Sequence, residues 1–191
     1  MSTTTPIREK DDIERLKNYF YNKKEYRNYL LVIIGLNTAL RISDVLQLKW
    51  TDVYHEENQC FYKHTILKEQ KTQKETMIPI NQSIQNGLKE YRHYENPRKS
   101  DYLFYSRKDH SRPIGREQAY RIIKNASLQL EITGHISCHS LRKTFGYQAW
   151  KTGAEPALLM SIYNHSSYGI TKRYLGIEQD DKDQLFLHNA L

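Results

Sequence analysis

The feature of the sequence that most constrains its fold is a strongly apolar segment within residues 26–40. Residues 30–34 are all apolar, and Leu36 follows after Gly35. A helix that is apolar on most of its faces must be surrounded by other elements. We therefore predict that this segment is a buried helix at the centre of the core. The apolar run is far too short to span a bilayer.

Apolar residues at helical spacing recur at three other places in the chain: Ile13, Leu16 and Phe20; Ala119, Ile122, Ile123, Ala126 and Leu130; and Leu141, Phe145 and Ala149. Residues 61–67 and 75–80 have the composition of strands, and the polar residues 68–74 are typical of the turn between them. A last helix is predicted near residues 181–187. At 191 residues, without repeats or a linker, the chain predicts one domain over residues 1–191. Its class is α+β, mainly helical with one small antiparallel β-sheet.

The chain is basic, with a formal net charge of +7 and an isoelectric point near 9.2. This charge favours a polyanionic partner or an anionic surface, but a merely basic soluble protein would have the same charge. Cys60 and Cys138 lie far apart and show no paired spacing, which fits a reducing cytoplasm. The N-terminus has no apolar signal-peptide region. We therefore expect a cytoplasmic protein that is not associated with a membrane.

Four short boxes carry the information about function. They are Ala39-Leu40-Arg41-Ile42-Ser43-Asp44, Lys71-Thr72-Gln73-Lys74 before Met77-Ile78-Pro79-Ile80, His139-Ser140-Leu141-Arg142-Lys143-Thr144-Phe145, and Asn164-His165 before Lys172-Arg173-Tyr174. In this order they resemble the catalytic domain of the tyrosine recombinases, the phage-integrase family. The resemblance covers nearly the whole chain. It implies the tyrosine-recombinase catalytic fold and a site-specific DNA recombinase or integrase. Such an enzyme cleaves and rejoins DNA through a 3′-phosphotyrosyl intermediate and needs no metal, ATP or other cofactor.

Arg41 and Arg142 are the candidates for binding the scissile phosphate. The pentavalent transition state of phosphodiester cleavage gathers negative charge on its nonbridging oxygens, and planar guanidinium donors match phosphate geometry. Either arginine alone would more often be a surface ion pair, so the assignment depends on the surrounding boxes. The resemblance implies that Asp44 orients Arg41 from behind.

His139 lies three residues before Arg142, so at the start of a helix both side chains can face one cleft. There His139 could donate a hydrogen bond to the phosphate and accept the proton of the attacking phenol. His135, Cys138 and His139 also have metal-ligand spacing. No second cluster supplies further ligands, so we expect no metal site. The alternative to a catalytic role is a structural histidine whose hydrogen bonds are made within the core.

The resemblance implies that a lysine in the β-turn protonates the leaving 5′-oxygen. Lys71 is our choice for this general acid, with Lys74 and Lys68 as alternatives. His165 stands nine positions before Tyr174, which is the family spacing between the second histidine and the nucleophile. The family usually has Leu-Gly-His here, whereas this chain has Tyr163-Asn164-His165. Asn tolerates the left-handed backbone conformation, so we expect it to replace the glycine.

Tyr174 is the expected nucleophile, because its phenolic oxygen can form the phosphotyrosyl bond when positive charge surrounds it. Without the other boxes it would be read as a half-buried aromatic residue. The expected partner is double-stranded DNA. Further DNA contacts are expected from the lysines and arginine near the boxes: Lys68, Lys74, Lys143, Lys172 and Arg173.

The family usually carries an N-terminal core-binding domain, for which the sequence leaves no room before the first box. The chain is therefore expected either to be an excised catalytic domain or to resemble the short recombinases that invert fimbrial DNA switches. Two other functions share part of the pattern. They are a type IB topoisomerase-like relaxase and a catalytically idle DNA-binding regulator, which is disfavoured because every catalytic position is filled.

The segment after Tyr174 carries Leu185, Phe186 and Leu187 beside the acidic residues Asp180, Asp181 and Asp183. A short helix with such an apolar end must bury it somewhere. In the resembled family the tail docks on a neighbouring protomer of a cyclic tetramer, and the alternative is docking on its own core. We expect a monomer in solution that self-associates on DNA, as a tetramer on paired sites.

Overall fold

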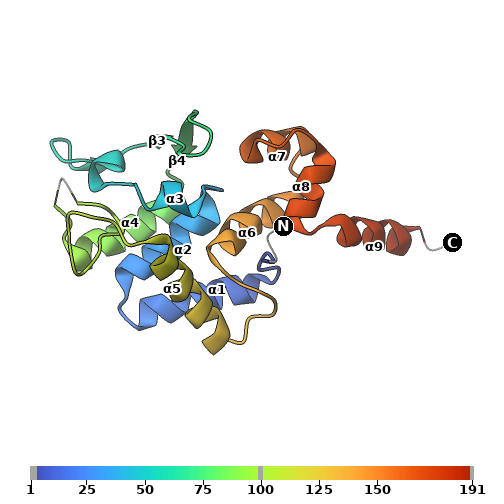
Figure 1. Cartoon of the computed structure of the whole chain (residues 1–191), viewed down its shortest axis with the longest axis horizontal. Coiled ribbons are helices and arrows are strands. Elements are labelled where there is room, and N and C mark those ends of the chain that lie inside the picture. Colours follow the sequence, from blue (N-terminus) through green and yellow to red (C-terminus); the bar gives the residue numbers. More distant parts are fainter. Residues whose placement is uncertain (1–3, 99–100, 190–191) are drawn as a thin grey trace.

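The computed structural model describes residues 4–98 and 101–189. Its helices are α1 (Lys10–Asn22), α2 (Tyr26–Asn37), α3 (Ile42–Val45), α4 (Gln82–Glu95), α5 (Arg116–Gln129), α6 (Cys138–Lys151), α7 (Pro156–Tyr163), α8 (Tyr168–Leu175) and α9 (Glu178–His188). A short 3-10 turn, η1 (Trp50–Asp52), follows α3. α2 lies inside the larger part of the molecule, packed against α1, α4 and α6, whereas α7 and α8 form a smaller lobe beside α6 (Figure 1). Within the described residues, no helix is long and apolar enough to cross a membrane.

The central helix predicted from the apolar segment is confirmed. From Leu30 to Ile34 no side chain of α2 is more than 2% exposed. Gly35 allows α6 to approach closely, because a Cβ atom at this position would lie 2.7 Å from Cδ1 of Leu141. Leu141 precedes Arg142 on α6, so this close packing sets the position of the helix that carries the second arginine box.

The strands form two separate antiparallel ladders rather than the one small sheet that the sequence predicted. β1 (Tyr54–His55) pairs with β2 (Cys60–Phe61), and β3 (His64–Lys68) pairs with β4 (Glu75–Pro79). Phe61 leaves the predicted first strand because it pairs with Tyr54 instead. The turn of the β3–β4 hairpin lies where the sequence predicted it. The α+β class with mainly helical content is confirmed.

A second apolar cluster holds the lobe of α7 and α8 against α6. Leu159 of α7 and Leu175 of α8 are fully buried there, together with Tyr163 and Ile177. Gly146 of α6 lies under both helices, since a Cβ atom there would be 2.5 Å from Tyr163 Oη and 2.6 Å from Leu175 Cδ2. The helix that carries Tyr174 is thus seated directly on the helix that carries Arg142.

α9 projects away from the rest of the molecule (Figure 1). Leu185, Phe186 and Leu187 are 63%, 77% and 77% exposed. The base of the helix is attached where Arg8 forms an ion pair with Asp180 (2.6 Å) and donates a hydrogen bond to the carbonyl of Gly176 (2.9 Å). The predicted helix is present, and its apolar end is not buried in its own core. The side chain of Asp181 and residues 190–191 lie outside the described part.

Replacing Gly146 by Ala should destabilise the protein by about 1–3 kcal/mol, because the added methyl overpacks the seat of the α7–α8 lobe. Urea unfolding followed by circular dichroism measures this change. Gly169→Ala is the matched control, since only Ser167 Oγ lies near, at 3.9 Å, and Ala favours the helix. Equal stability of the two variants would contradict the seating of the lobe on α6.

Candidate active site

Arg41 and Arg142 come together although they are distant in the sequence. Ala39 has a left-handed backbone (φ 52°) in the turn after α2, and Arg41 is the N-cap of α3. Arg142 Nη1 donates a hydrogen bond to the carbonyl of Ala39, which lies 103 residues away in the chain. Its guanidinium also lies 4.8 Å from the centre of the Tyr163 ring. The two predicted arginines therefore border one site.

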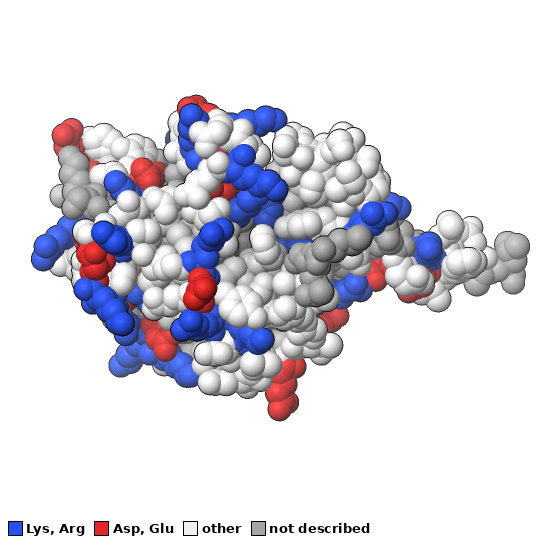
Figure 2. Space-filling view, in the orientation of Figure 1, with Lys and Arg blue, Asp and Glu red and all other residues white. Residues whose placement is uncertain are grey.

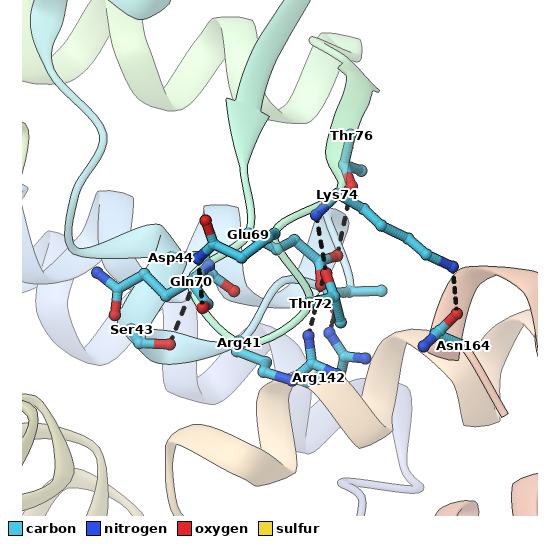
Figure 3. Close-up of polar contacts among 12 residues, drawn as sticks. Arg41, Ser43, Asp44, Glu69, Gln70, Thr72, Lys74, Thr76, Arg142 and Asn164 are labelled. Carbon is cyan, nitrogen blue, oxygen red and sulfur yellow. Dashed lines mark hydrogen bonds and ion pairs between the residues drawn. The ribbon is translucent and has the colours of Figure 1, made fainter.

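A carboxylate that the sequence reading missed pairs with the first arginine. Glu69, which directly follows β3, accepts a hydrogen bond from Arg41 Nη1 through Oε2 at 2.6 Å (Figure 3). Thr72 Oγ1 donates to the same oxygen at 2.9 Å. Side chains of a strand alternate between its two faces, which places Thr65, Leu67 and Glu69 on one face. The structure turns this face inward, since Thr65 and Glu69 are buried and Leu67 is half-buried. The alternation was therefore the signal in the sequence for Glu69.

The carboxylate of Asp44, which was expected to orient Arg41 from behind, contacts the turn after β3. Its carboxylate is buried, and Oδ1 accepts a hydrogen bond from the backbone N–H of Gln70 at 2.9 Å. Asp44 therefore holds the turn after β3, and Glu69 is the residue that contacts Arg41 directly. The reason is geometric: Arg41 is the N-cap of α3 and its side chain extends toward the hairpin, whereas Asp44 lies in the α3 turn beneath Gln70.

His139 lies in the first turn of α6, where Ser137 caps the helix by accepting a hydrogen bond from the His139 N–H. It borders an open cavity of about 780 Å³ together with Arg41, Lys71 and two residues of α5, Arg116 and Tyr120. Partial burial and the charges of Arg142, Lys143 and Arg41 lower the pKa of His139. The imidazole is therefore neutral at physiological pH and able to accept a proton.

The lysines of the β3–β4 hairpin point in different directions. Lys71 is exposed and lines the cavity beside Arg41 and His139. Lys74 instead reaches across to the lobe, where its Nζ donates a hydrogen bond to Asn164 Oδ1 at 2.8 Å (Figure 3). Lys68 ends β3 opposite Glu75 and is exposed.

His165 and Tyr174 lie together on the lobe. Asn164 has the left-handed conformation that was expected for it (φ 54°) and ends α7. His165 Nδ1 and Thr171 Oγ1 are 3.0 Å apart, which fixes the ring against α8. The ring centres of His165 and Tyr174 are separated by 5.3 Å. The nine-residue spacing thus places the second histidine beside the phenol.

The arginines partly offset the effect of burial on the phenol. Burial raises the pKa of Tyr174, while the charge and hydrogen bonding of Arg142, and the charge of Arg41, lower it; the net direction is upward. Burial and the same two arginines lower the pKa of His165. Tyr174 is therefore protonated at neutral pH, so any attack by its oxygen would require a proton acceptor.

Lys143, which was expected to contact DNA, lies inside the protein. It is 5% exposed, and its Nζ donates a hydrogen bond to the Thr4 carbonyl at 2.5 Å and lies 5.1 Å from the Tyr174 ring centre. Its place on α6 turns it toward the N-terminal segment and away from solvent. Lys172 and Arg173 lie on α8 beside Tyr174, half-buried and exposed respectively. Figure 2 shows Lys and Arg side chains gathered in the hollow between the hairpin and the lobe.

The three side chains with metal-ligand spacing do not form a cation site in the described residues. No group of three or more His, Cys, Asp or Glu side chains converges in residues 4–98 and 101–189. Burial raises the pKa of the Cys138 thiol to about 12, so the thiol is protonated at neutral pH.

Residues 8–180 match the model of the phage integrase family. This chain belongs to that family. It is 39% identical over 180 residues to the probable integrase/recombinase YoeC of Bacillus subtilis strain 168, covering 94% of this chain and 93% of YoeC. It is 26% identical over 158 residues to the type 1 fimbriae regulatory protein FimE of Escherichia coli K12, covering 81% and 76% of the two chains.

Solved structures of the same fold include XerA recombinase and XerH site-specific recombinase bound to a palindromic difH substrate. XerA superposes with a TM-score of 0.75 at 19% identity, and XerH with 0.71 at 21%. The matches cover 100% and 96% of this chain but only 65% and 53% of the XerA and XerH chains.

Replacing Lys143 by Ala should lower stability by about 1–3 kcal/mol, because it removes a buried stem and its hydrogen bond. Lys68→Ala on the exposed hairpin should stay within about 0.5 kcal/mol of the unsubstituted protein. Urea unfolding measures both changes. If Lys143→Ala were fully stable and instead weakened the salt dependence of DNA binding, Lys143 would be a surface contact after all.

Proposed function

We propose that this protein is a site-specific DNA recombinase that cleaves and rejoins DNA through a 3′-phosphotyrosyl intermediate. The observation that carries the proposal is the convergence of His139, His165 and Tyr174 on the two arginines, Arg41 and Arg142, whose charges act on all three side chains. These residues come from four separate elements, so their convergence is a property of the fold and not of one local motif. Membership of the phage integrase family supports the same activity.

In the proposed reaction, Arg41 and Arg142 bind the nonbridging oxygens of the scissile phosphate and stabilise the charge that develops on them. The Tyr174 oxygen forms a bond to phosphorus as the bond to the 5′-oxygen breaks. His139 takes the phenol proton, and His165 donates a hydrogen bond to the phosphate. Rejoining reverses these steps with a 5′-hydroxyl as the nucleophile. The ester conserves the energy of the broken bond, so the cycle needs neither ATP nor a metal.

The placement of the hairpin lysines favours Lys71 as the general acid. The attacking and leaving oxygens of phosphoryl transfer lie roughly in line, on opposite sides of phosphorus. Lys74 Nζ is bonded to Asn164, on the same side as His165 and Tyr174. Lys71 instead lines the cavity beside Arg41 and His139, and the described lining of that cavity includes no residue of α7 or α8. We therefore assign the protonation of the leaving 5′-oxygen to Lys71.

The proposed substrate is double-stranded DNA, to which the net charge of +7 contributes electrostatic attraction. The XerH structure holds a difH substrate, which supports the same partner for this chain. The free cysteines and a DNA substrate are consistent with action in the cytoplasm. Relaxation of any supercoiled plasmid, without site preference, would favour the topoisomerase-like alternative.

Tyr174→Phe should abolish the covalent adduct and leave DNA binding nearly unchanged, because it deletes the nucleophilic oxygen and little contact area. The substrate is a nicked suicide duplex from the flanks of the gene, and the adduct is detected by its shift on a denaturing gel. Tyr168→Phe, on the same helix, is the control and should keep the adduct. An adduct formed at the normal level by Tyr174→Phe would refute the assignment of the nucleophile.

The exposed apolar end of α9 is proposed to dock on a neighbouring protomer when two sites pair. Changing Leu185, Phe186 and Leu187 together to Ser should leave the free energy of unfolding unchanged, because these side chains are exposed. Binding to one half-site should also persist, while paired-site complexes on native gels and strand exchange should fall by at least about tenfold, the scale of losing a buried apolar contact of about 1.4 kcal/mol. Loss of folding would instead place the tail in its own core.

A further inference from the structure

A carboxylate beside two arginines that are proposed to bind phosphate requires a physical explanation. Glu69 lies 2.6 Å from Arg41, and the charge of Arg142 also acts on it. A bound phosphate would carry the same sign of charge as Glu69. The carboxylate therefore either competes with the phosphate or holds Arg41 in place for it.

Glu69 is held from within its own hairpin. Its two carboxylate oxygens accept hydrogen bonds from Thr72 Oγ1 at 2.9 Å and from Thr76 Oγ1 at 3.4 Å. Its backbone N–H donates to the carbonyl of Lys74 and its carbonyl accepts from the N–H of Gln73, both at 2.9 Å. The backbone bonds fix Glu69 in the turn, and its carboxylate cannot swing away without breaking the hydrogen bonds from Thr72 and Thr76.

Glu69 is also ionised. Burial opposes its charge, but hydrogen bonds from Thr72 and Arg41 and the charges of Arg41 and Arg142 outweigh this effect, so the pKa of Glu69 lies below its ordinary value. An arginine has five N–H donors, and Glu69 engages only Nη1 of Arg41. The remaining donors of Arg41 stay available for a phosphate.

We propose that Glu69 is a positioning residue that couples Arg41 to the turn bearing Lys71. Through one carboxylate, the guanidinium that holds the phosphate is tied to Thr72, the residue next to Lys71. Asp44 supports the same turn from beneath through the N–H of Gln70. Arg41 and the ammonium group of Lys71 are thereby presented to the phosphate as one unit. This inference rests on the proposed function and on Lys71 as the general acid.

The test uses a substrate whose 5′-bridging oxygen is replaced by sulfur. A thiolate leaves without needing a proton, so the ratio of the cleavage rates on sulfur and oxygen DNA reports the general-acid step alone. Rates of adduct formation are measured for the unsubstituted protein and for Lys71→Ala, Glu69→Ala and Glu69→Gln. Glu75→Gln is the matched control, since it removes an exposed carboxylate from the same hairpin.

We expect Lys71→Ala to raise the sulfur-to-oxygen ratio by about a hundredfold or more, the scale of general-acid catalysis. Glu69→Ala should raise the sulfur-to-oxygen ratio by at least about tenfold, because Lys71 is no longer held in place relative to Arg41. Glu69→Gln should raise the ratio less, because an amide still accepts hydrogen bonds. Glu75→Gln should leave it unchanged. In the Lys71→Ala background, Glu69→Ala should add nothing to the ratio, because the acid is already missing.

Other outcomes would overturn the inference. A Glu69→Ala variant that slows both substrates equally, while Lys71→Ala is rescued by sulfur, would show a merely structural role for Glu69 and leave the proposed function intact. Faster cleavage of oxygen DNA by Glu69→Gln would show that the carboxylate competes with phosphate. If no variant, Lys71→Ala included, changed the ratio, both Lys71 and the coupling would be wrong. Absence of any adduct with the unsubstituted protein would overturn the proposed function itself.

Discussion

The site depends on one buried charge, the guanidinium of Arg142. Burying a charge is costly unless it is paired and hydrogen-bonded. Here the cost is offset by the carbonyl of Ala39 and the face of Tyr163. The Ala39 carbonyl is available because the chain turns through a left-handed residue just before Arg41. The hydrogen bond that stabilises Arg142 therefore also fixes the backbone two residues before Arg41.

The same residue attaches the lobe that carries Tyr174. Tyr163 Oη donates a hydrogen bond to the backbone carbonyl of Arg142 at 2.7 Å, and Gly146, one turn further along α6, leaves room for α7 and α8 to pack. α6 is thus the shared wall between the α2 core and the α7–α8 lobe (Figure 1). Arginine, histidine and tyrosine keep their relative positions because one helix is packed closely on both sides.

Features that depend on a local sequence pattern could be predicted from the sequence. The apolar run predicted α2, and the spacing within the boxes predicted that His139 lies near Arg142 and His165 near Tyr174. The sequence did not predict contacts between side chains that are distant in the chain. Lys143 follows Arg142 and reads as a surface lysine, yet the helix turns it beneath Tyr174. The family resemblance offered Asp44 as the residue that orients Arg41, and it did not point to Glu69, which the hairpin brings into contact with Arg41 from 28 residues away. Strand alternation can place Glu69 on the inward face, but its partner is chosen by packing, which no local spacing encodes.

The electrostatics of the site bear on how Tyr174 would lose its proton. Burial leaves the pKa of the phenol above its ordinary value despite the two arginines. Glu69 already cancels part of the charge of Arg41, and a bound phosphate would bring further negative charge, which disfavours a phenolate. A phenolate formed before attack is therefore disfavoured both in the free protein and with DNA bound.

His139, whose pKa is lowered, is neutral and can take the proton as the bond to phosphorus forms. In the proposed reaction, proton transfer and attack consequently occur in one step.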